Sequence, residues 1–251
     1  MLASLKADFK KIFTVRSTYV LSGIMLLLTA VMCFYLEGYK GSTDSSAAAL
    51  QTDAFTMVSS TMASIGAVFA AIIVILFMTY EYRYNTIMYT LTANASRTKV
   101  LLSKIITTIL FATAFSVLVA AASIGLYLLG VLLRNVHLPT QDFHFWAEFG
   151  KNAAYYSAYA LIALFIAALV RSIVGAVAVL FVFPMAGEGI LSMVLKEKAA
   201  YLPFTAMNAI IDPGKPGDDT LTFSRAIVVS ALYVAVIGII TWLVFLRRDV
   251  S

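Results

Sequence analysis

Few side chains in this sequence are of the types that catalyse reactions or bind metals, and their spacing argues against both. The two histidines, His137 and His144, are seven residues apart in one polar segment, which is not the i, i+4 spacing of a helical metal site. Neither the phosphate-binding loop G-x-x-x-x-G-K-[ST] nor the catalytic patterns H-E-x-x-H and G-x-S-x-G occur. We therefore expect a chain that is not an enzyme, has no catalytic residue, holds no metal or cofactor and does not itself hydrolyse ATP.

One acidic residue, Glu188, stands inside a long apolar run. It lies between Gly187 and Gly189 and follows Pro184, where a helix would kink or break. Two interpretations of Glu188 remain open. The carboxylate is a gate or substrate contact near the outer side of a membrane, or it is stabilised by the dipole at the start of a short helix over residues 190–195.

The composition excludes a soluble domain. The chain has 251 residues, of which 61% are hydrophobic and only 12% charged, whereas soluble domains carry about 25% charged residues. The mean hydropathy is +0.92. These values predict one all-α integral membrane domain over residues 1–251, because long apolar runs need lipid or other such helices around them. The six expected spans are residues 19–36, 61–80, 105–133, 153–170, 172–195 and 226–246.

The basic residues predict the orientation in the membrane. With both termini on one side, that side holds eleven of the eighteen Lys and Arg residues against only Asp8, Glu81 and Asp249, and the other side holds seven cations and ten acids. Cations gather in cytoplasmic segments, so both termini of this multi-pass protein are expected in the cytoplasm, at the cell membrane. The net charge of +5 then reflects orientation and does not indicate a nucleic-acid partner.

Residues 1–16 have the pattern of a helix lying on the membrane surface. Five apolar residues fall within one arc of a helical wheel: Leu2, Leu5, Phe9, Ile12 and Phe13. Lys6 and Lys10 flank this stripe and can reach lipid head groups, while Lys11 is expected to face water. The alternative is a basic anchor that only fixes orientation.

Residues 196–225 form a second distinct segment, on the outer side of the expected topology. Residues 200–211 are apolar but too few to span a bilayer, and a run rich in Asp, Pro and Gly follows them. We expect a re-entrant or interfacial segment that packs at the outer membrane face, because its apolar side chains would otherwise be exposed to water.

Between the second and third spans lies a polar, basic segment, residues 81–104, which predicts a cytoplasmic loop. It carries Glu81-Tyr82-Arg83, Thr86-Ile87, Thr90-Leu91, Arg97, Val100-Leu101 and Lys104. This series resembles the E-Y-R-x-x-T-I-x-x-T-L…R-x-x-V-L-x-x-K pattern of the permeases of ABC-2 type transporters. The sequence departs from that pattern at Asn85, where glycine is usual, and at Ala95, where proline is frequent. The basic start of the chain, the six spans and the shared side of both termini are also similar.

The resemblance implies a transmembrane subunit of a bacterial exporter. Such a subunit pairs with a second permease, identical or different, and with separate ATPase subunits that bind the ATP. It also implies that the loop forms a short coupling helix that docks on the ATPase. The residues expected at that contact are Glu81, Arg83, Thr86, Ile87, Leu91 and Arg97. The alternative is a membrane module of another class, such as the substrate-capture subunit of an importer or a membrane sensor or assembly protein.

Overall fold

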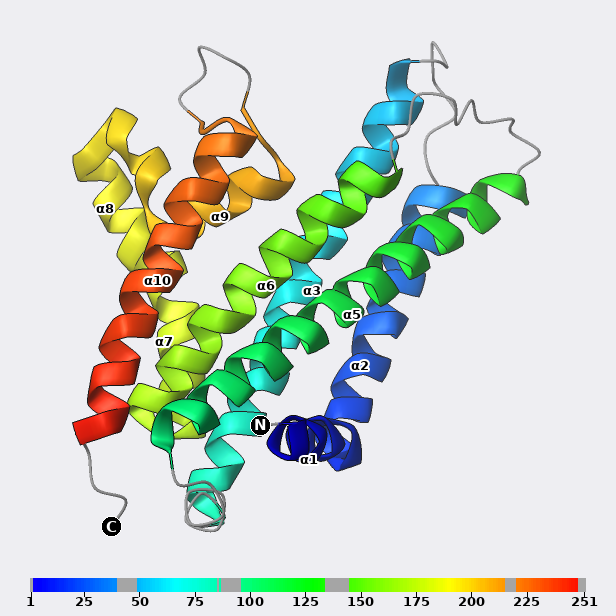
Figure 1. Cartoon of the computed structure of the whole chain (residues 1–251). Helices are drawn as coiled ribbons and strands as arrows, with labels where there is room; N and C mark the ends of the chain where they lie inside the picture. Colours follow the sequence, from blue (N-terminus) through cyan, green and yellow to red (C-terminus); the bar gives the residue numbers. More distant parts are fainter. Residues whose placement is uncertain are drawn as a thin grey trace.

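The computed structural model describes residues 2–39, 49–84, 86, 96–133, 145–214 and 220–247. All regular secondary structure in these ranges is helical (Figure 1). The elements are α1 (Leu2–Thr14), α2 (Arg16–Thr29) continued by the π-helical η1 (Ala30–Tyr39), α3 (Ala49–Arg83), α5 (Arg97–Leu132), α6 (Phe145–Val170), α7 (Ile173–Val182), the π-helical η2 (Phe183–Gly187), α8 (Glu188–Leu195), the 3₁₀-helical η3 (Lys196–Tyr201), α9 (Pro203–Ile211) and α10 (Phe223–Arg247).

Within the described ranges, six helices are long and apolar enough to cross a membrane. They cover Arg16–Leu36, Ser59–Arg83, Arg97–Leu132, Trp146–Val170, Ile173–Leu195 and Phe223–Arg247. Each coincides with one of the six expected spans, so the prediction of an all-α membrane protein is confirmed. The spans run alternately up and down between two ends of the bundle, which we call the α1 end and the α9 end (Figure 1).

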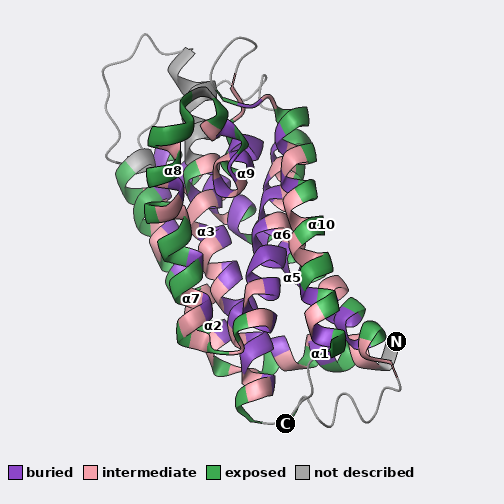
Figure 2. Cartoon of the chain, turned by 90° about the vertical axis from the view of Figure 1, so that its left-hand side faces the viewer, coloured by how far each residue is buried: buried purple, intermediate pink, exposed green. Residues whose placement is uncertain are grey.

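Helix α6 lies at the centre of the bundle and contacts α3, α5, α9 and α10 (Figure 2). Its small residues Ala160, Ala163 and Ala167 are fully buried, which lets neighbouring helices approach closely. One of its large residues meets a glycine on a neighbouring helix. A Cβ added at Gly66 of α3 would collide with the hydroxyl of Tyr156.

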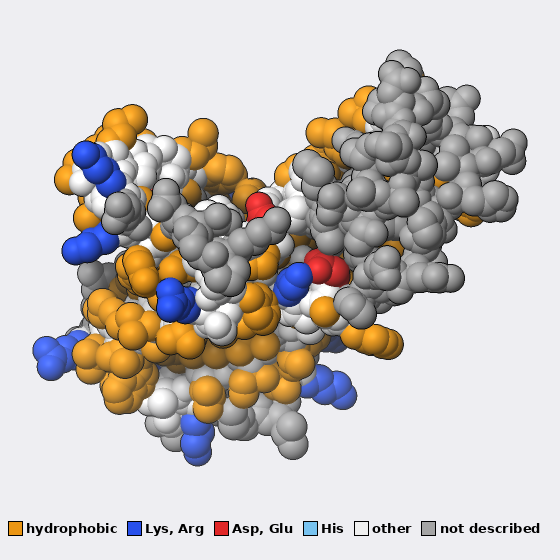
Figure 3. All heavy atoms as spheres, turned by 90° about the horizontal axis from the view of Figure 1, so that it is seen from above, with side chains coloured by type: hydrophobic (Ala, Val, Ile, Leu, Met, Phe, Trp, Pro, Cys, Tyr) orange, Lys and Arg blue, Asp and Glu red, His pale blue; other side chains and the backbone are white. Residues whose placement is uncertain are grey.

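The outward faces of α2, α7, α8 and α10 expose large apolar side chains (Figure 2). In the view onto the α9 end, apolar side chains gather mainly over the lower left part of the molecule (Figure 3). A water-soluble monomer does not expose so much apolar surface. Lipid or further helices must therefore cover these faces.

The fifth span is interrupted but not broken. Its three pieces, α7, η2 and α8, form one continuous helical run over Ile173–Leu195, and the π-helical turn contains Pro184. A wider turn accommodates a residue that cannot donate a backbone hydrogen bond. The irregularity expected at this proline is therefore a π-helical turn, and the helical run continues through it.

Helix α9 forms within the apolar stretch expected to pack at one face of the membrane. Pro203 begins the helix, where the missing N–H costs nothing, and six of its nine side chains are buried: Phe204, Ala206, Met207, Ala209, Ile210 and Ile211. They pack against α6 and α10. This stretch is therefore packed against the bundle and does not stand in solvent, as expected. Its place at the outer membrane face stays a prediction.

Two expectations at the α1 end need correction. Segment 81–104 is not a loop at its ends, because α3 continues to Arg83 and α5 begins at Arg97, eight residues before the expected span. Hydropathy alone predicts a loop here, because the terminal turns of both helices carry charged residues. In addition, Lys11 does not simply face water, because its ammonium binds Glu81 while part of its side chain stays exposed. Asp8 and Ile12 are buried, Phe13 is exposed, and Lys11 points into the protein.

Candidate functional site: a buried ion cluster at the α1 end

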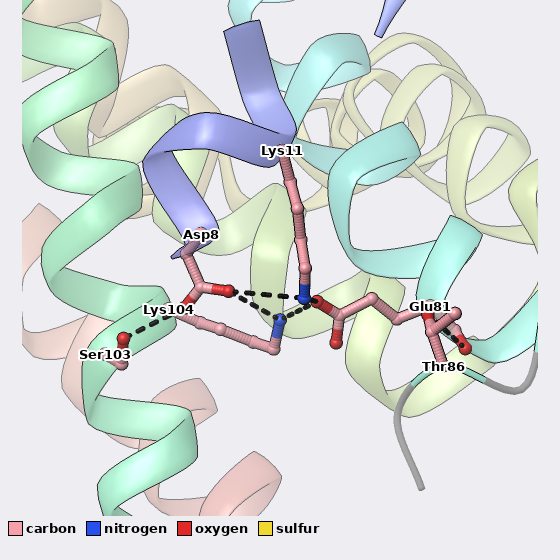
Figure 4. Close-up of polar contacts among 6 residues, drawn as sticks. All are labelled: Asp8, Lys11, Glu81, Thr86, Ser103 and Lys104. Carbon is pink, nitrogen blue, oxygen red and sulfur yellow. Dashed lines mark hydrogen bonds and ion pairs between the residues drawn. The ribbon is translucent and has the colours of Figure 1, made fainter. Parts of the chain in front are cut away.

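Four charged side chains from three helices meet at the α1 end of the bundle (Figure 4). Asp8 and Lys11 come from α1, Glu81 from the last turn of α3 and Lys104 from the third turn of α5. We call these four residues the ion cluster. Lys104 is completely buried and the two carboxylates are nearly so, which makes the cluster unusual among charged groups.

The geometry centres on one oxygen of Glu81. Its Oε1 lies 2.7 Å from the ammonium of Lys11 and 2.7 Å from the ammonium of Lys104. Asp8 lies on the other side of both lysines, with Oδ1 3.7 Å from Lys11 Nζ and 3.8 Å from Lys104 Nζ. Two carboxylates and two ammonium groups make the cluster neutral.

Further contacts hold the buried members in place. Ser103 Oγ donates a hydrogen bond of 2.9 Å to Asp8 Oδ2, and the Lys104 ammonium lies 4.6 Å from the centre of the Phe77 ring. Such a cation–π contact is worth about 2 kcal/mol when the cation is desolvated. Charges that are buried in this way stabilise a fold only while all of their partners are present, since removing one leaves an uncompensated charge.

A cavity of about 220 Å³ adjoins the cluster between α1, α2 and α3. Glu81 and Lys11 belong to its wall, and most of the remaining wall is apolar. The second carboxylate oxygen of Glu81, Oε2, is buried and accepts no hydrogen bond within the described part of the chain.

The structure separates the sequence-predicted contact residues into inward and outward groups. Glu81 points into the bundle, whereas Arg83 is exposed in the last turn of α3 and Thr86 is exposed three residues beyond it. Tyr84, which follows Arg83 and was not among the predicted contacts, is 64% exposed. The Arg83 guanidinium lies 5.8 Å from the centre of the Tyr84 ring. Ile87 and Leu91 lie outside the described residues.

Arg97, the remaining predicted contact residue, binds another helix of the same chain. Its Nη1 donates to the carbonyls of Phe245 and Leu246 at 3.4 and 3.3 Å, at the C-terminal end of α10. The last carbonyls of a helix lack intrahelical partners and carry partial negative charge, so a guanidinium suits this position. Trp242 Nε1 also donates to Thr98 Oγ1 at 3.3 Å, which adds a second link between α5 and α10.

The turn between α6 and α7 is attached to the same end of α3. Arg171 adopts a φ of 57°, a conformation that costs a non-glycine residue roughly 1–2 kcal/mol. Its guanidinium lies 5.0 Å from the centre of the Tyr82 ring, next to Glu81 in sequence. The strained turn thus places a cation against an aromatic side chain of α3.

Glu188, the candidate gate, lies at the α9 end, far from the ion cluster. It is buried at the start of α8, but its carboxylate does not serve that helix. Oε1 accepts from the backbone N–H of Phe204 at 2.7 Å, and Oε2 accepts from the N–H and hydroxyl of Thr205 at 2.9 and 2.8 Å. Glu188 therefore accepts hydrogen bonds from the N–H groups at the start of α9, which have no partner within that helix. Its negative charge is also stabilised by the partial positive charge at this helix end.

Asp8, Lys11 and Ser103 are the members of this site that sequence reasoning missed. A signal was present, because Asp8 is the only acid within the basic stretch 1–16, and an acid there is unexpected on a helix that faces anionic lipid. Among the described residues, no group of three or more His, Cys, Asp or Glu side chains could hold a metal ion. The two histidines lie outside the described residues. What the cluster can do is mechanical: it fastens α1, α3 and α5 together.

The fold and the six apolar helices define a multi-pass, all-α membrane protein. The chain belongs to a family described as protein of unknown function (DUF2705), whose model matches residues 6–251. No curated protein matches the sequence.

Proposed function

We propose that this chain is the permease subunit of an ATP-binding-cassette exporter in the cell membrane. It forms part of the translocation path together with a second permease, and separate ATPase subunits drive it. The α1 end faces the cytoplasm in this proposal, so both termini are cytoplasmic. The α9 end faces outward.

The observation that carries the proposal is the ion cluster at the end of α3. The motif that resembles ABC-2 permeases begins at Glu81 and ends at Lys104, and these two residues lie 2.7 Å apart. This ion pair joins the end of α3 to the start of α5, on either side of the segment between them. A segment that docks on an ATPase and transmits its movement needs such a fixed attachment. Asp8 and Lys11 extend the same cluster to α1.

A mechanism follows from this arrangement. Arg83, Tyr84 and Thr86 are exposed just beyond the cluster, where a partner can contact them. A displacement of the segment by closing ATPases acts on the ends of α3 and α5 together, because Glu81 and Lys104 link them. Helices α1 and α10 follow, since the cluster holds α1 and Arg97 holds the end of α10. Rigid-body rocking of packed helices is an established way to alternate access to a path.

The distribution of cations supports the orientation. The described residues at the α1 end include Lys6, Lys10, Lys11, Arg16, Arg83, Arg97, Lys99, Lys104 and Arg171. Cytoplasmic segments of membrane proteins are enriched in Lys and Arg.

Copurification tests the proposal. A tagged ATPase that carries a phosphate loop and is encoded beside this chain should retain the wild-type permease. Leu91→Asp should release the ATPase, because the new carboxylate would lose its water at the proposed contact and this loss costs free energy. Leu133→Asp is the matched control, since Leu133 is an exposed leucine at the opposite end of α5.

The proposal predicts that Leu133→Asp retains the ATPase and that both variants remain in the membrane. Retention of the ATPase by Leu91→Asp would remove the docking assignment. A membrane sensor or assembly protein, among the alternatives, predicts that no such ATPase is retained even by the wild type.

A further inference from the structure

We propose that the cavity beside Lys11 is a binding site for one anionic phospholipid, with a hydrocarbon chain inside it and the phosphate on the Lys11 ammonium. This lipid is a resident ligand and not a transported cargo. The inference therefore stands on the cavity alone and does not depend on the proposed transport function.

The cavity has the size and lining of a hydrocarbon site. Its 220 Å³ corresponds to the volume of about seven water molecules. Its apolar wall is made by Ile12, Val15, Ile73, Leu76 and Phe77. Water in such a space finds few hydrogen-bond partners, so an apolar chain is the favoured occupant.

The cavity lies at the end of the first two spans, which is the level of lipid head groups when these helices cross a bilayer. Its lining includes the residues where α1 turns into the first span α2, and α1 itself crosses this end of the bundle (Figure 1). Polar groups are also placed there, because Ser17 Oγ and the Tyr80 hydroxyl lie 3.3 Å apart and both residues line the cavity. An apolar interior with a polar rim fits an amphiphile better than a purely apolar molecule.

The ammonium of Lys11 is the group that would bind the phosphate of the lipid head group. Lys11 lines the cavity, and its side chain remains 38% exposed although it belongs to the ion cluster. Within the described residues its ammonium donates a hydrogen bond to Glu81 and lies 3.7 Å from Asp8 Oδ1, whereas an ammonium has three donors. The remaining N–H groups are available to phosphate oxygens, which form strong charge-assisted hydrogen bonds.

The surrounding charge favours an anion over a cation. The ion cluster as a whole presents no net charge to the cavity, because its two ammonium groups balance the carboxylates of Asp8 and Glu81. Outside the neutral cluster, Lys6, Lys10 and Arg16 are exposed on the same part of the chain. Such cations attract anionic lipid head groups.

Native mass spectrometry of the purified full-length protein, combined with thermal unfolding in detergent, tests this site. Phosphatidylglycerol, phosphatidylcholine with the same chains, and inorganic phosphate are added in separate titrations. The proposal predicts one tightly held phosphatidylglycerol per chain and a raised unfolding temperature. Phosphatidylcholine should bind about tenfold more weakly, because it lacks net negative charge. Inorganic phosphate should produce no stabilisation, because it has no chain to fill the cavity.

Two pairs of variants distinguish a specific lipid site from diffuse electrostatic attraction of lipid to the protein. Lys11→Gln combined with Glu81→Gln removes the phosphate ligand while leaving Asp8 and Lys104 as a balanced pair, and Lys10→Gln removes an exposed lysine outside the cavity wall. Leu76→Trp fills the cavity, and Leu102→Trp places the same residue on an exposed position of α5. Only the first member of each pair should lose the bound lipid.

Several results would overturn the proposal. Equal loss of phosphatidylglycerol in Lys10→Gln and in the Lys11 and Glu81 double variant would mean diffuse electrostatic attraction. Undiminished binding in Leu76→Trp would mean that no chain enters the cavity. Equal binding of phosphatidylcholine would mean that Lys11 does not select the head group, and stabilisation by inorganic phosphate would mean that an ion alone suffices.

Discussion

The ammonium of Lys104 and Oε1 of Glu81 lie 2.7 Å apart, at the two ends of the motif that joins α3 to α5. Lys104 is fully buried and the Glu81 side chain nearly so. Lys11 reaches the same oxygen from α1 at the same distance. One carboxylate thus holds three helices, and its removal would affect all of them together.

Replacing Lys104 with alanine should strongly destabilise the protein. The change leaves Asp8 and Glu81 with only the ammonium of Lys11, which is partly exposed, so the buried charge is no longer balanced. Breaking one partner of a buried ion pair costs about 3–5 kcal/mol. Thermal unfolding in detergent measures the loss, and a variant that swaps Glu81→Lys with Lys104→Glu should recover part of it.

Lys99→Ala is the control for this prediction. Lys99 is an exposed lysine on the same helix, and its removal should change the free energy of unfolding by less than about 0.5 kcal/mol. If Lys104→Ala and Lys99→Ala unfold at the same temperature, the ion cluster does not stabilise the bundle.

Glu188→Ala should loosen α9 without unfolding the rest of the chain. Three donors of Phe204 and Thr205 lose their acceptor. The N–H of Phe204 is buried, and an unsatisfied buried donor costs about 1–3 kcal/mol, whereas the two partly buried donors of Thr205 cost less. Hydrogen exchange should therefore become faster at the amides of residues 203–211 while those of α6 stay protected. Glu188→Gln keeps an acceptor oxygen and should show a smaller effect. Unchanged exchange in Glu188→Ala would show that this carboxylate does not cap α9.

Gly66→Ala should destabilise the contact between α3 and α6. The added methyl group collides with the Tyr156 hydroxyl and lies 2.9 Å from the ring carbon that bears it. Overpacking of this kind costs about 1–3 kcal/mol. Tyr156→Phe in the same chain removes the hydroxyl and should restore part of the unfolding temperature. A purely additive loss in the double variant would contradict this geometry.

Arg97→Gln should fray the end of α10. The substitution removes the guanidinium that binds the Phe245 and Leu246 carbonyls, so amide exchange in the last turn of α10 should accelerate. Lys99→Gln, two residues along the same helix, is the control and should leave that turn unchanged. Equal exchange in the two variants would show that Arg97 does not cap α10.

The six spans could be predicted because apolar length alone identifies them. Glu81, Arg83, Arg97 and Lys104 stood out because charges between two apolar runs are conspicuous. Their directions could not be predicted. Glu81 and Lys104 turn inward and Arg97 binds α10, because partners distant in sequence decide where each side chain points.

Asp8 and Lys11 show the limit of helical periodicity. The wheel for residues 1–16 marks an apolar stripe and assigns Lys11 to water, but Lys11 instead pairs with a residue 70 positions away. Glu188 shows a related limit. From the sequence, its charge was expected to be stabilised by the helix that contains it. In the structure, the carboxylate instead reaches the start of α9, 16 and 17 positions along the chain.

Crosslinking in the cell tests the central claim most directly. A photoreactive amino acid replaces Tyr84, which is exposed beside the ion cluster, and in a second strain it replaces Trp146, which is 88% exposed at the α9 end. The account predicts a covalent adduct between the Tyr84 position and an ATPase subunit that carries a phosphate loop, and none from the Trp146 position. An adduct with that ATPase from Trp146, or none from Tyr84 while the ATPase is expressed, would contradict the account.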